Sequence, residues 1–170
     1  KHAGSGGLES LQIIFNIFRR RPIGALFEQA KAKNVALIVR LPLASGLLAG
    51  KFTKDTTFAR QDHRNFNRDG EHFNAGETFA GLPFEKGVEL ADMIKPMVPP
   101  HPRKITMAQF AIRWCLDFDA VTTVIPGAKN PKQATDNAAA SDLPRLSRSI
   151  HNDLAKFYTE RVAAHIRGVY

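Results

Sequence analysis

The sequence has very little cysteine, since Cys115 is the only one in 170 residues. A single thiol cannot form an internal disulfide, and by itself it cannot build a cysteine-type zinc site. Chains without disulfides are typical of reducing compartments, so we expect a cytoplasmic protein. Because Cys115 falls on the apolar face of an expected helix, we interpret it as a buried and unreactive thiol.

Long hydrophobic runs are also lacking. The longest apolar stretch, residues 35–49, is broken by Arg40, Pro42, Ser45 and Gly46, whereas a membrane span needs about 20 apolar residues. We therefore expect no transmembrane segment. Residues 1–7 hold neither an initiator methionine nor the apolar region of a secretory signal, so we interpret them as a cut edge.

The positive charge is not concentrated in any one segment. The formal net charge is +8, and the first and second halves of the chain contribute equally to it. Only Arg19, Arg20 and Arg21 form a run, and no basic patch interleaved with aromatic residues is present. We expect no nucleic acid as partner, although a basic nucleic-acid binder stays open as a rival. A phosphate-bearing cofactor or chance explains a diffuse positive field equally well.

Length and composition predict one soluble folded domain. Apolar residues make up 44% and charged residues 24% of the chain, which is close to the average of globular proteins. A complete eight-stranded α/β barrel takes about 250 residues. If this chain is barrel-like, it is short for a complete one.

Alternating strand and helix patterns predict an α/β fold. Residues 11–15, 35–39 and 121–125 are short apolar runs without alternation, which is typical of parallel strands buried on both faces. An amphipathic pattern over residues 22–33 lies between the first two and completes a βαβ unit. Thr106 and Asn130 are expected to cap helices that flank the third strand.

Three further segments complete the expected organisation. Residues 84–95 form a helix pattern, and Ser147 caps a last helix whose apolar face would pack on something not obviously present in the chain. Residues 51–81 form a long polar loop without periodicity, and loops of that length are usually functional or disordered. Five spaced phenylalanines favour a packed loop: Phe52, Phe58, Phe66, Phe73 and Phe79.

Two segments directly follow expected strands, where α/β proteins bind ligands. Residues 40–51 and 126–137 combine small residues with lysines. Small residues let an anion approach backbone N–H groups, and the start of the helix after Asn130 offers unsatisfied donors. Gln133 and Asn137 share one face of that helix and could hold a phosphate or a purine edge. Taken alone, residues 126–137 favour a solvated helix face after a Pro-Gly turn, and residues 40–51 are equally compatible with a loop whose glycines permit a tight path.

Together, four motifs form a much more specific pattern: residues 12–16, 41–51, 110–116 and 125–137. In order and spacing they resemble the C-terminal half of aldo-keto reductases, over roughly residues 6–166. The resemblance implies an α/β fold, namely a partial (β/α)8 TIM barrel with strands six to eight. It implies a single domain over residues 1–170 with an enlarged loop at residues 51–81.

The resemblance also implies a nicotinamide cofactor, NADPH, and roles for individual residues. Gln12 matches the glutamine that binds the nicotinamide carboxamide. Arg40 stands where the family usually has an aromatic residue stacked on the nicotinamide ring, and Leu41 replaces a common serine. A guanidinium plane can also stack on a ring, so stacking by Arg40 is a hypothesis.

The phosphate and adenosine contacts follow the same resemblance. The residues that match the pyrophosphate-binding loop are Pro42, Leu43, Ala44, Ser45 and Lys51. The residues that match the adenosine-binding segment are Gly127, Lys129, Gln133, Asp136 and Asn137. Among these, Lys129 is our candidate for contact with the 2′-phosphate, at a position where barrel enzymes commonly bind phosphate.

The implied activity is reduction of aldehydes or ketones to alcohols with NADPH, but the catalytic residues cannot be assigned. Family catalysis uses an Asp, a Tyr, a Lys and a His from the first half of the barrel, which no part of this sequence resembles. Its tyrosines, Tyr158 and Tyr170, lie in or beyond the last helix. We therefore expect a fragment that carries the cofactor side and that, in isolation, does not turn over a carbonyl substrate.

Other candidate chemistry is weaker. Asp62, His63, Asp69 and His72 lack a recognisable metal-ligand spacing, so we interpret them as solvated loop side chains. Asp117 and Asp119 are expected to be solvent-exposed side chains of a turn. Residues 19–21 are expected to lie in a solvated βα loop. A clamp over the cofactor by Arg64 and Arg68 stays open.

A non-catalytic nucleotide-binding or interaction module of the same fold is the main alternative function. We also expect the isolated chain to associate with itself through the open edges of the first and third strands.

Overall fold

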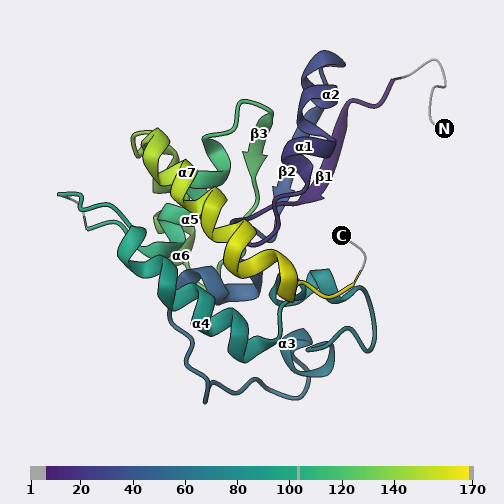
Figure 1. Cartoon of the computed structure of the whole chain (residues 1–170), viewed down its shortest axis with the longest axis vertical. Coiled ribbons are helices and arrows are strands. Elements are labelled where there is room, and N and C mark those ends of the chain that lie inside the picture. Colours follow the sequence, from purple (N-terminus) through teal and green to yellow (C-terminus); the bar gives the residue numbers. More distant parts are fainter. Residues whose placement is uncertain (1–6, 103, 169–170) are drawn as a thin grey trace.

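The computed structural model describes residues 7–102 and 104–168, and it has a three-stranded parallel sheet at its centre (Figure 1). The strands are β1 (Ser10–Ile14), β2 (Ala36–Arg40) and β3 (Val121–Val124), in the order β1-β2-β3. Their bounds agree with the predicted strands to within one residue. Residues 1–6 and Tyr170 lie outside the described residues. The cut-edge interpretation therefore also falls outside them.

The connection from β1 to β2 is helical, as predicted, but it consists of two short helices. Helix α1 (Pro22–Ala25) and helix α2 (Phe27–Ala32) are separated at Leu26, whose φ of −132° and ψ of −37° leave the helical region. Phe27 and Ala30 are buried, as the amphipathic pattern predicts. The parallel pairing of β1 with β2 confirms the βαβ unit.

The two helices that flank β3 begin where their capping residues predict. Helix α5 (Met107–Leu116) starts with a complete capping box, in which Thr106 and Gln109 bind each other's backbone N–H groups. Helix α6 (Pro131–Ala138) starts at Asn130, whose side chain accepts a hydrogen bond from the backbone N–H of Gln133. Both caps satisfy donors that the first helical turn leaves without a partner.

The last long helix, α7 (Arg148–Phe157), packs on this chain, so the expectation that its partner is absent was wrong. Leu154 and Phe157 are buried, and the imidazole of His151 stacks on Trp114 with ring centroids 6.4 Å apart. The guanidinium group of Arg20 lies over the rings of both Trp114 and Tyr158. Helix α5 and the loop after β1 therefore provide the surface that covers α7. This contact joins segments far apart in sequence and has no local signal.

Aromatic rings fill the core between the sheet and its helices. Phe15, at the end of β1, stacks on Trp114 of α5 with centroids 4.9 Å apart, and Phe27 and Phe118 contact its edges. Cys115 is fully buried and its thiol lies 3.6 Å from the backbone oxygen of Phe15. Burial raises the pKa of this thiol well above its ordinary value. The interpretation of Cys115 as a buried thiol is confirmed.

The sheet is buried on one face only, which corrects the prediction of strands buried on both faces. Leu37 and Val39 of β2 point into the core, whereas Ile38 is only half-buried. The register pairs Ile38 with Gln12 on one side and Thr123 on the other, and both of these are exposed. We call the face with these three residues the uncovered face of the sheet, because they are exposed or only half-buried. Within the described residues, β1 and β3 each pair only with β2.

The long loop, residues 51–81, is packed and contains short helical turns. These are α3 (His63–Phe66), η2 (Ala75–Glu77) and η3 (Phe79–Gly81). Its Phe52, Phe58 and Phe79 form a ring cluster with Phe84 at the start of helix α4 (Phe84–Ile94), which confirms the packed loop. The other two phenylalanines do not belong to this cluster: Phe66 and Phe73 contact each other at the surface and are 38% and 42% exposed.

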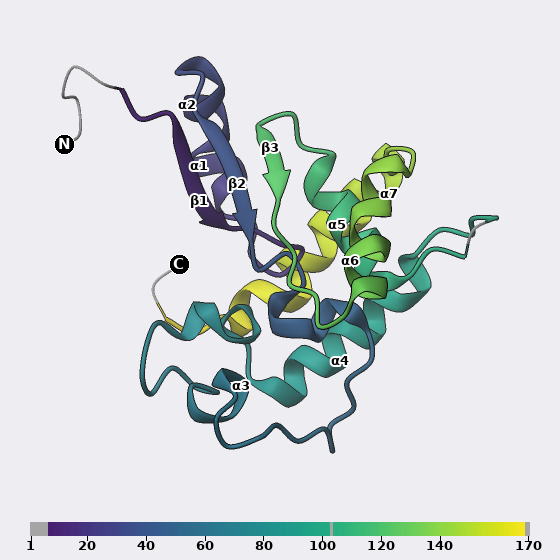
Figure 2. The same cartoon turned by 180° about the vertical axis from the view of Figure 1, so that it is seen from behind.

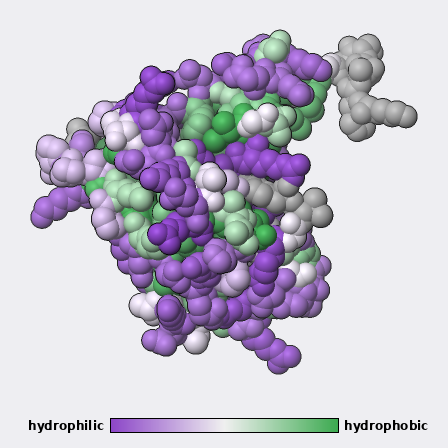
Figure 3. All heavy atoms as spheres, viewed as in Figure 1, coloured by the Kyte–Doolittle hydropathy of each residue, from purple (hydrophilic) through white to green (hydrophobic). Residues whose placement is uncertain are grey.

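On the face seen in Figure 3, hydrophobic residues reach the surface in separate patches among polar ones. Across residues 7–102 and 104–168, none of the helices has the length and apolar character that crossing a bilayer requires.

Candidate functional site

The two segments predicted to bind a ligand lie at the same edge of the sheet. All three strands run in parallel, and the turns that follow β2 and β3 lie beneath their carboxyl ends, beside the long loop (Figure 2). The helical turn η1 (Ala44–Ala49) follows β2 and contacts η3, α4 and α5. This edge therefore gathers residues 40–51, residues 126–137 and the end of the long loop.

The turn after β2 has an unusual backbone. Leu41, Ala44 and Ser45 have φ values of 54°, 48° and 57°, and Gly46 follows at 104°. Positive φ is uncommon for residues other than glycine and persists only where surrounding contacts hold it. Pro42 and Ala44 are buried here, whereas Lys51 is exposed. Such a concentration of strained residues next to strand ends is typical of ligand-binding loops.

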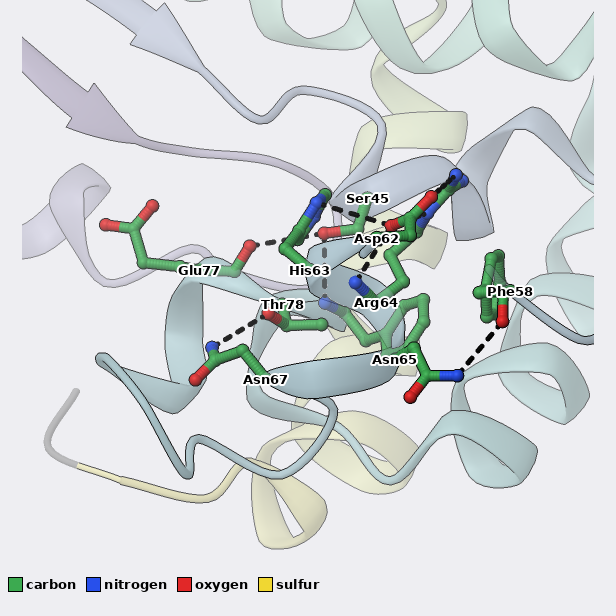
Figure 4. A network of polar contacts seen from close by, with 10 residues as sticks. Ser45, Phe58, Asp62, His63, Arg64, Asn65, Asn67, Glu77 and Thr78 are labelled. Atoms are coloured by element: carbon green, nitrogen blue, oxygen red, sulfur yellow. Dashed lines mark hydrogen bonds and ion pairs between the residues drawn. The ribbon is translucent and has the colours of Figure 1, made fainter. Parts of the chain in front are cut away.

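The hydroxyl group of Ser45 forms hydrogen bonds to the backbone of the long loop. Its Oγ donates to the backbone oxygen of Glu77 at 3.2 Å and accepts from the backbone N–H of Phe79 at 3.1 Å. Figure 4 shows Ser45 facing the backbone of Glu77, while the Glu77 side chain extends in the other direction. The predicted phosphate-loop residue Ser45 thus fastens the end of the long loop to η1.

Arg40, at the last position of β2, forms a two-pronged ion pair with Glu77. Its Nη1 and Nη2 donate to Oε1 and Oε2 of Glu77 at 2.7 and 2.5 Å. These hydrogen bonds raise the pKa of the Arg40 guanidinium above its ordinary value. Sequence reasoning missed Glu77, because its partner is 37 positions away and the residues around it have no periodic pattern. Stacking of Arg40 on a nicotinamide ring stays a prediction.

The two arginines proposed as a clamp lie on phenylalanines of the loop region. Arg64 lies over Phe58, with its guanidinium carbon 4.4 Å from the ring centroid, and it pairs with Asp62. Arg68 lies over Phe84 and pairs with Glu85. Both guanidinium groups therefore have partners within the chain, and their action as a clamp stays untested.

The segment after β3 is organised by the two amides of α6. Gln133 Oε1 accepts from the backbone N–H of Lys129 at 2.8 Å, and Asn137 Nδ2 donates to the backbone oxygen of Gly127 at 3.2 Å. The two residues thus share one helix face, as predicted, and both hold the turn before α6. A Cβ added to Gly127 would meet nothing within 4 Å, so the backbone there is open to solvent.

The two lysines of this segment differ in whether a carboxylate pairs with them. Lys132 pairs with Asp136 at 2.7 Å, which compensates both charges. Lys129 is exposed, and in residues 7–102 and 104–168 no carboxylate lies within ion-pair distance of its ammonium group. Lys129 is therefore the cation of this turn that an anionic group could reach at low cost.

Gln12 lies on the uncovered face of the sheet. It pairs in register with Ile38 of β2, and Arg40 follows two residues later on the same face, because strand side chains alternate. Gln12 and Arg40 therefore face the same side from adjacent strands. A groove of about 390 Å³ lies beside β3, lined by residues such as Thr123, Pro126 and Asn137.

Several polar residues that we expected in solvent are structural. Arg19 is buried and donates to the backbone oxygen of Ala80, so the interpretation of residues 19–21 as a solvated loop was wrong for it. The side chain of Asp117 is only 3% exposed and accepts hydrogen bonds from Arg113 and from the backbone N–H of Leu146, which corrects its assignment to a solvated turn. Asp119 is exposed, as expected.

The acidic residues and histidines of the long loop, residues 51–81, are not gathered into a cluster of three or more potential metal ligands. Asp62 caps α3 through the backbone N–H of Arg64, and the Arg64 guanidinium holds the pKa of its carboxyl well below the ordinary range. Among the residues that the structure describes, no group of three or more potential ligands could hold a metal ion.

Comparisons with known proteins show the family and the fold. The model of the aldo/keto reductase family matches residues 3–159. A probable voltage-gated potassium channel subunit beta of Arabidopsis thaliana is 28% identical over 135 residues, which cover 76% of this chain and 37% of that protein. The aldo-keto reductase YhdN of Bacillus subtilis is 25% identical over 126 residues, which cover 74% of this chain and 35% of that protein.

Solved structures show the same fold. The glycerol dehydrogenase AKR11B4 from Gluconobacter oxydans superimposes with a TM-score of 0.71 at 23% identity, over 95% of this chain and 45% of that one. The holo form of the aldo-keto reductase AKR11C1 from Bacillus halodurans gives a TM-score of 0.61 at 19% identity, over 89% of this chain and 43% of that one. The chain thus spans less than half the length of these relatives, and its sheet corresponds to part of a barrel.

Proposed function

Since the chain belongs to the aldo/keto reductase family, we propose that it carries the cofactor side of an NADPH-dependent reductase of aldehydes and ketones. The observation that supports this most is the common edge of the sheet. There, the turn after β2 carries the exposed Lys51, and the turn after β3 carries the exposed Lys129 and an open backbone at Gly127. Parallel α/β proteins bind phosphate groups at this place.

The donor chemistry of this edge suits a dinucleotide phosphate. The Lys129 ammonium would bind the 2′-phosphate. A phosphate group could also come close to the backbone N–H groups near Gly127, because no side chain stands there. Residues of η1 and Lys51 would face the pyrophosphate. Gln133 and Asn137 keep the turn in shape through their own hydrogen bonds to it and leave Lys129 facing outward.

The nicotinamide end would lie over the uncovered face of the sheet, with Gln12 binding its carboxamide and Arg40 against its ring. When bound, the cofactor supplies a hydride for the substrate carbonyl carbon, while an acid protonates the oxygen. Among the described residues no tyrosine stands at this edge: Tyr158 lies under the guanidinium group of Arg20, in the π-helical turn η6 (Tyr158–Val162) after α7. The family resemblance implies an acid from the first half of the barrel, which no part of this sequence resembles, so we assign the acid to a segment outside residues 1–170 and expect no turnover by these residues alone.

The cofactor assignment is tested by titrating the protein with NADPH and NADH before and after Lys129→Ala. A single exposed charge-assisted contact is worth about 1 kcal/mol, so NADPH affinity should fall about fivefold to tenfold and NADH affinity should not change. Lys33→Ala removes the same charge at the other end of the strands and serves as the control. An equal effect on both cofactors would remove Lys129 from the 2′-phosphate role.

A non-catalytic nucleotide-binding module is the second candidate. The names of the relatives support it, since they include both reductases and a channel subunit. A carbonyl-reduction assay with NADPH separates the two for the whole protein: turnover supports the reductase, and cofactor binding without turnover supports the module. Turnover by residues 1–170 alone would contradict our assignment of the acid to a segment outside them.

A further inference from the structure

Glu77 joins the long loop to the candidate cofactor site at two points. Its carboxylate binds the guanidinium group of Arg40 through both oxygens, and its backbone oxygen accepts a hydrogen bond from Ser45. Both partners belong to the residues that would face the cofactor. No other described residue of the long loop contacts Arg40 through an ion pair.

The position of Glu77 is set by buried contacts on either side of it. Gly76 packs against the buried Arg19 guanidinium so closely that a Cβ there would clash with it. Thr78 is buried, and its hydroxyl accepts a hydrogen bond from Asn67 at 3.1 Å. Asn74 caps the turn η2 by accepting from the backbone N–H of Gly76 at 2.7 Å. The carboxylate is therefore held in place before any ligand binds.

The ion pair also differs from an ordinary surface pair in its geometry. The side chains of Arg40 and Glu77 are 37% and 24% exposed, and a two-pronged arrangement fixes the plane of the guanidinium group. The loop pair of Arg68 with Glu85 joins only one oxygen, and Glu85 is more than half exposed. The Arg40–Glu77 pair thus determines how the guanidinium plane faces the uncovered side of the sheet.

The Glu77 carboxylate also compensates the positive charge of the Arg40 guanidinium. An unpaired guanidinium next to a nicotinamide ring would repel the oxidised ring, which is positively charged, but not the neutral reduced ring. With Glu77 in place, the pair is neutral overall. Removal of either partner would therefore change the relative affinity for the two redox states of the cofactor, and in opposite directions.

We propose that Glu77 is a positioning residue of the cofactor site, which orients Arg40 and neutralises its charge so that the site accepts both the oxidised and the reduced nicotinamide. This proposal rests on the proposed function, because it requires that a nicotinamide binds beside Arg40. It assigns a role to the end of the long loop that neither the comparisons nor the strand pattern provide.

The test measures the dissociation constants of NADP⁺ and NADPH for the full protein and its variants. In Glu77→Gln, NADP⁺ binding should weaken about tenfold and NADPH binding less than threefold, for charges about 6 Å apart at an interface with water. Glu85→Gln, which breaks the other loop pair, should leave both constants unchanged. In Arg40→Gln the remaining carboxylate should favour NADP⁺ instead, so the ratio should shift the other way.

The outcomes separate the inference from the proposed function. Equal weakening of NADP⁺ and NADPH in Glu77→Gln, or an unchanged ratio in both variants, overturns the role of Glu77 while the cofactor site stands. If Glu77→Gln does not fold, Arg40→Gln tests the proposal by itself. Its ratio of NADP⁺ to NADPH dissociation constants should shift toward tighter NADP⁺ binding, and an unchanged ratio overturns the role of Glu77. A wild-type protein that binds neither form of the cofactor overturns both proposals.

Discussion

The imidazole Nε2 of His151 lies 2.9 Å from the carboxylate Oδ2 of Asp117, and this contact joins α7 to the end of α5 across 34 residues. The other carboxylate oxygen accepts from Arg113 Nε at 2.9 Å. Asp117 precedes β3, so this network lies at the end of the strand away from the candidate site. We interpret it as the anchor of the last helix.

Removal of the Asp117 carboxylate should destabilise the protein strongly. Asp117→Ala leaves the charge of the Arg113 side chain, which is only 10% exposed, without its carboxylate partner. Loss of one partner from such a pair costs about 3–5 kcal/mol of unfolding free energy. Urea unfolding measures this, with Asp119→Ala as the control because Asp119 pairs with Arg145 at the surface. Equal stability of the two variants would show that the network does not anchor α7.

The cap of α3 should make stability depend on pH in the acid range. The Arg64 guanidinium and backbone bind the Asp62 carboxylate and lower its pKa below the ordinary 3.8. A lowered pKa in the folded state stabilises the protein above about pH 4, and this contribution disappears as the pH falls through the folded-state value.

Asp62→Asn can still cap α3 but loses the charge-assisted hydrogen bonds to the Arg64 guanidinium, so it should be less stable than the wild type by about 1 kcal/mol at neutral pH. The difference should shrink as the pH falls below about 4, because the Asp62 carboxyl becomes protonated first in the unfolded state and only at lower pH in the folded state. Unfolding in urea at a series of pH values tests this, with Asp55→Asn as an exposed control in the same loop. A difference that is constant down to about pH 2 would contradict the linkage to Asp62.

The close packing of Gly76 predicts a sharp contrast between two glycines. In Gly76→Ala the added methyl group would collide with the Arg19 guanidinium, which is buried and bound to the backbone oxygen of Ala80. Overpacking of this kind costs about 1–3 kcal/mol. Gly127→Ala has open space around its Cβ and should leave thermal stability unchanged. The prediction fails if both variants unfold at the same temperature.

The local part of the fold follows from the sequence. Thr106, Asn130 and Ser147 each cap a helix at the predicted place, because a cap joins a side chain to a backbone group three residues away. The three strands also lie where the apolar runs predict them. Their shared edge follows from parallel pairing alone, so the strand pattern is sufficient to bring residues 40–51 and 126–137 together.

The long-range contacts could not be predicted in this way. Arg40 and Glu77, like Asp117 and His151, meet only because the tertiary fold brings distant segments together. The lack of alternation in the strands wrongly predicted burial on both faces for the same reason. Whether the second face is buried depends on other segments packing against it, and the strand sequences do not encode this. Without that cover, Gln12 and Thr123 are exposed.

The open edges of the sheet should cause residues 1–170 to associate in solution. Within the described residues, β1 and β3 each leave one edge without a strand partner, and Ile125 just after β3 is 46% exposed. Unpaired edges offer backbone donors and acceptors to other chains. Sedimentation velocity should show a mass that rises with concentration, and Ile125→Lys should weaken this association. A monodisperse monomer that unfolds cooperatively would contradict the prediction.

The most direct test of the cofactor site is hydrogen–deuterium exchange of the protein with and without saturating NADPH. Our account predicts slower exchange in peptides that cover residues 41–51 and 127–137, the two turns at the carboxyl ends of β2 and β3. It predicts no change in α2 or at the Asp117 network, which lie at the other end of the strands. Protection that is absent from both turns while NADPH is bound would contradict the assignment of this edge as the cofactor site.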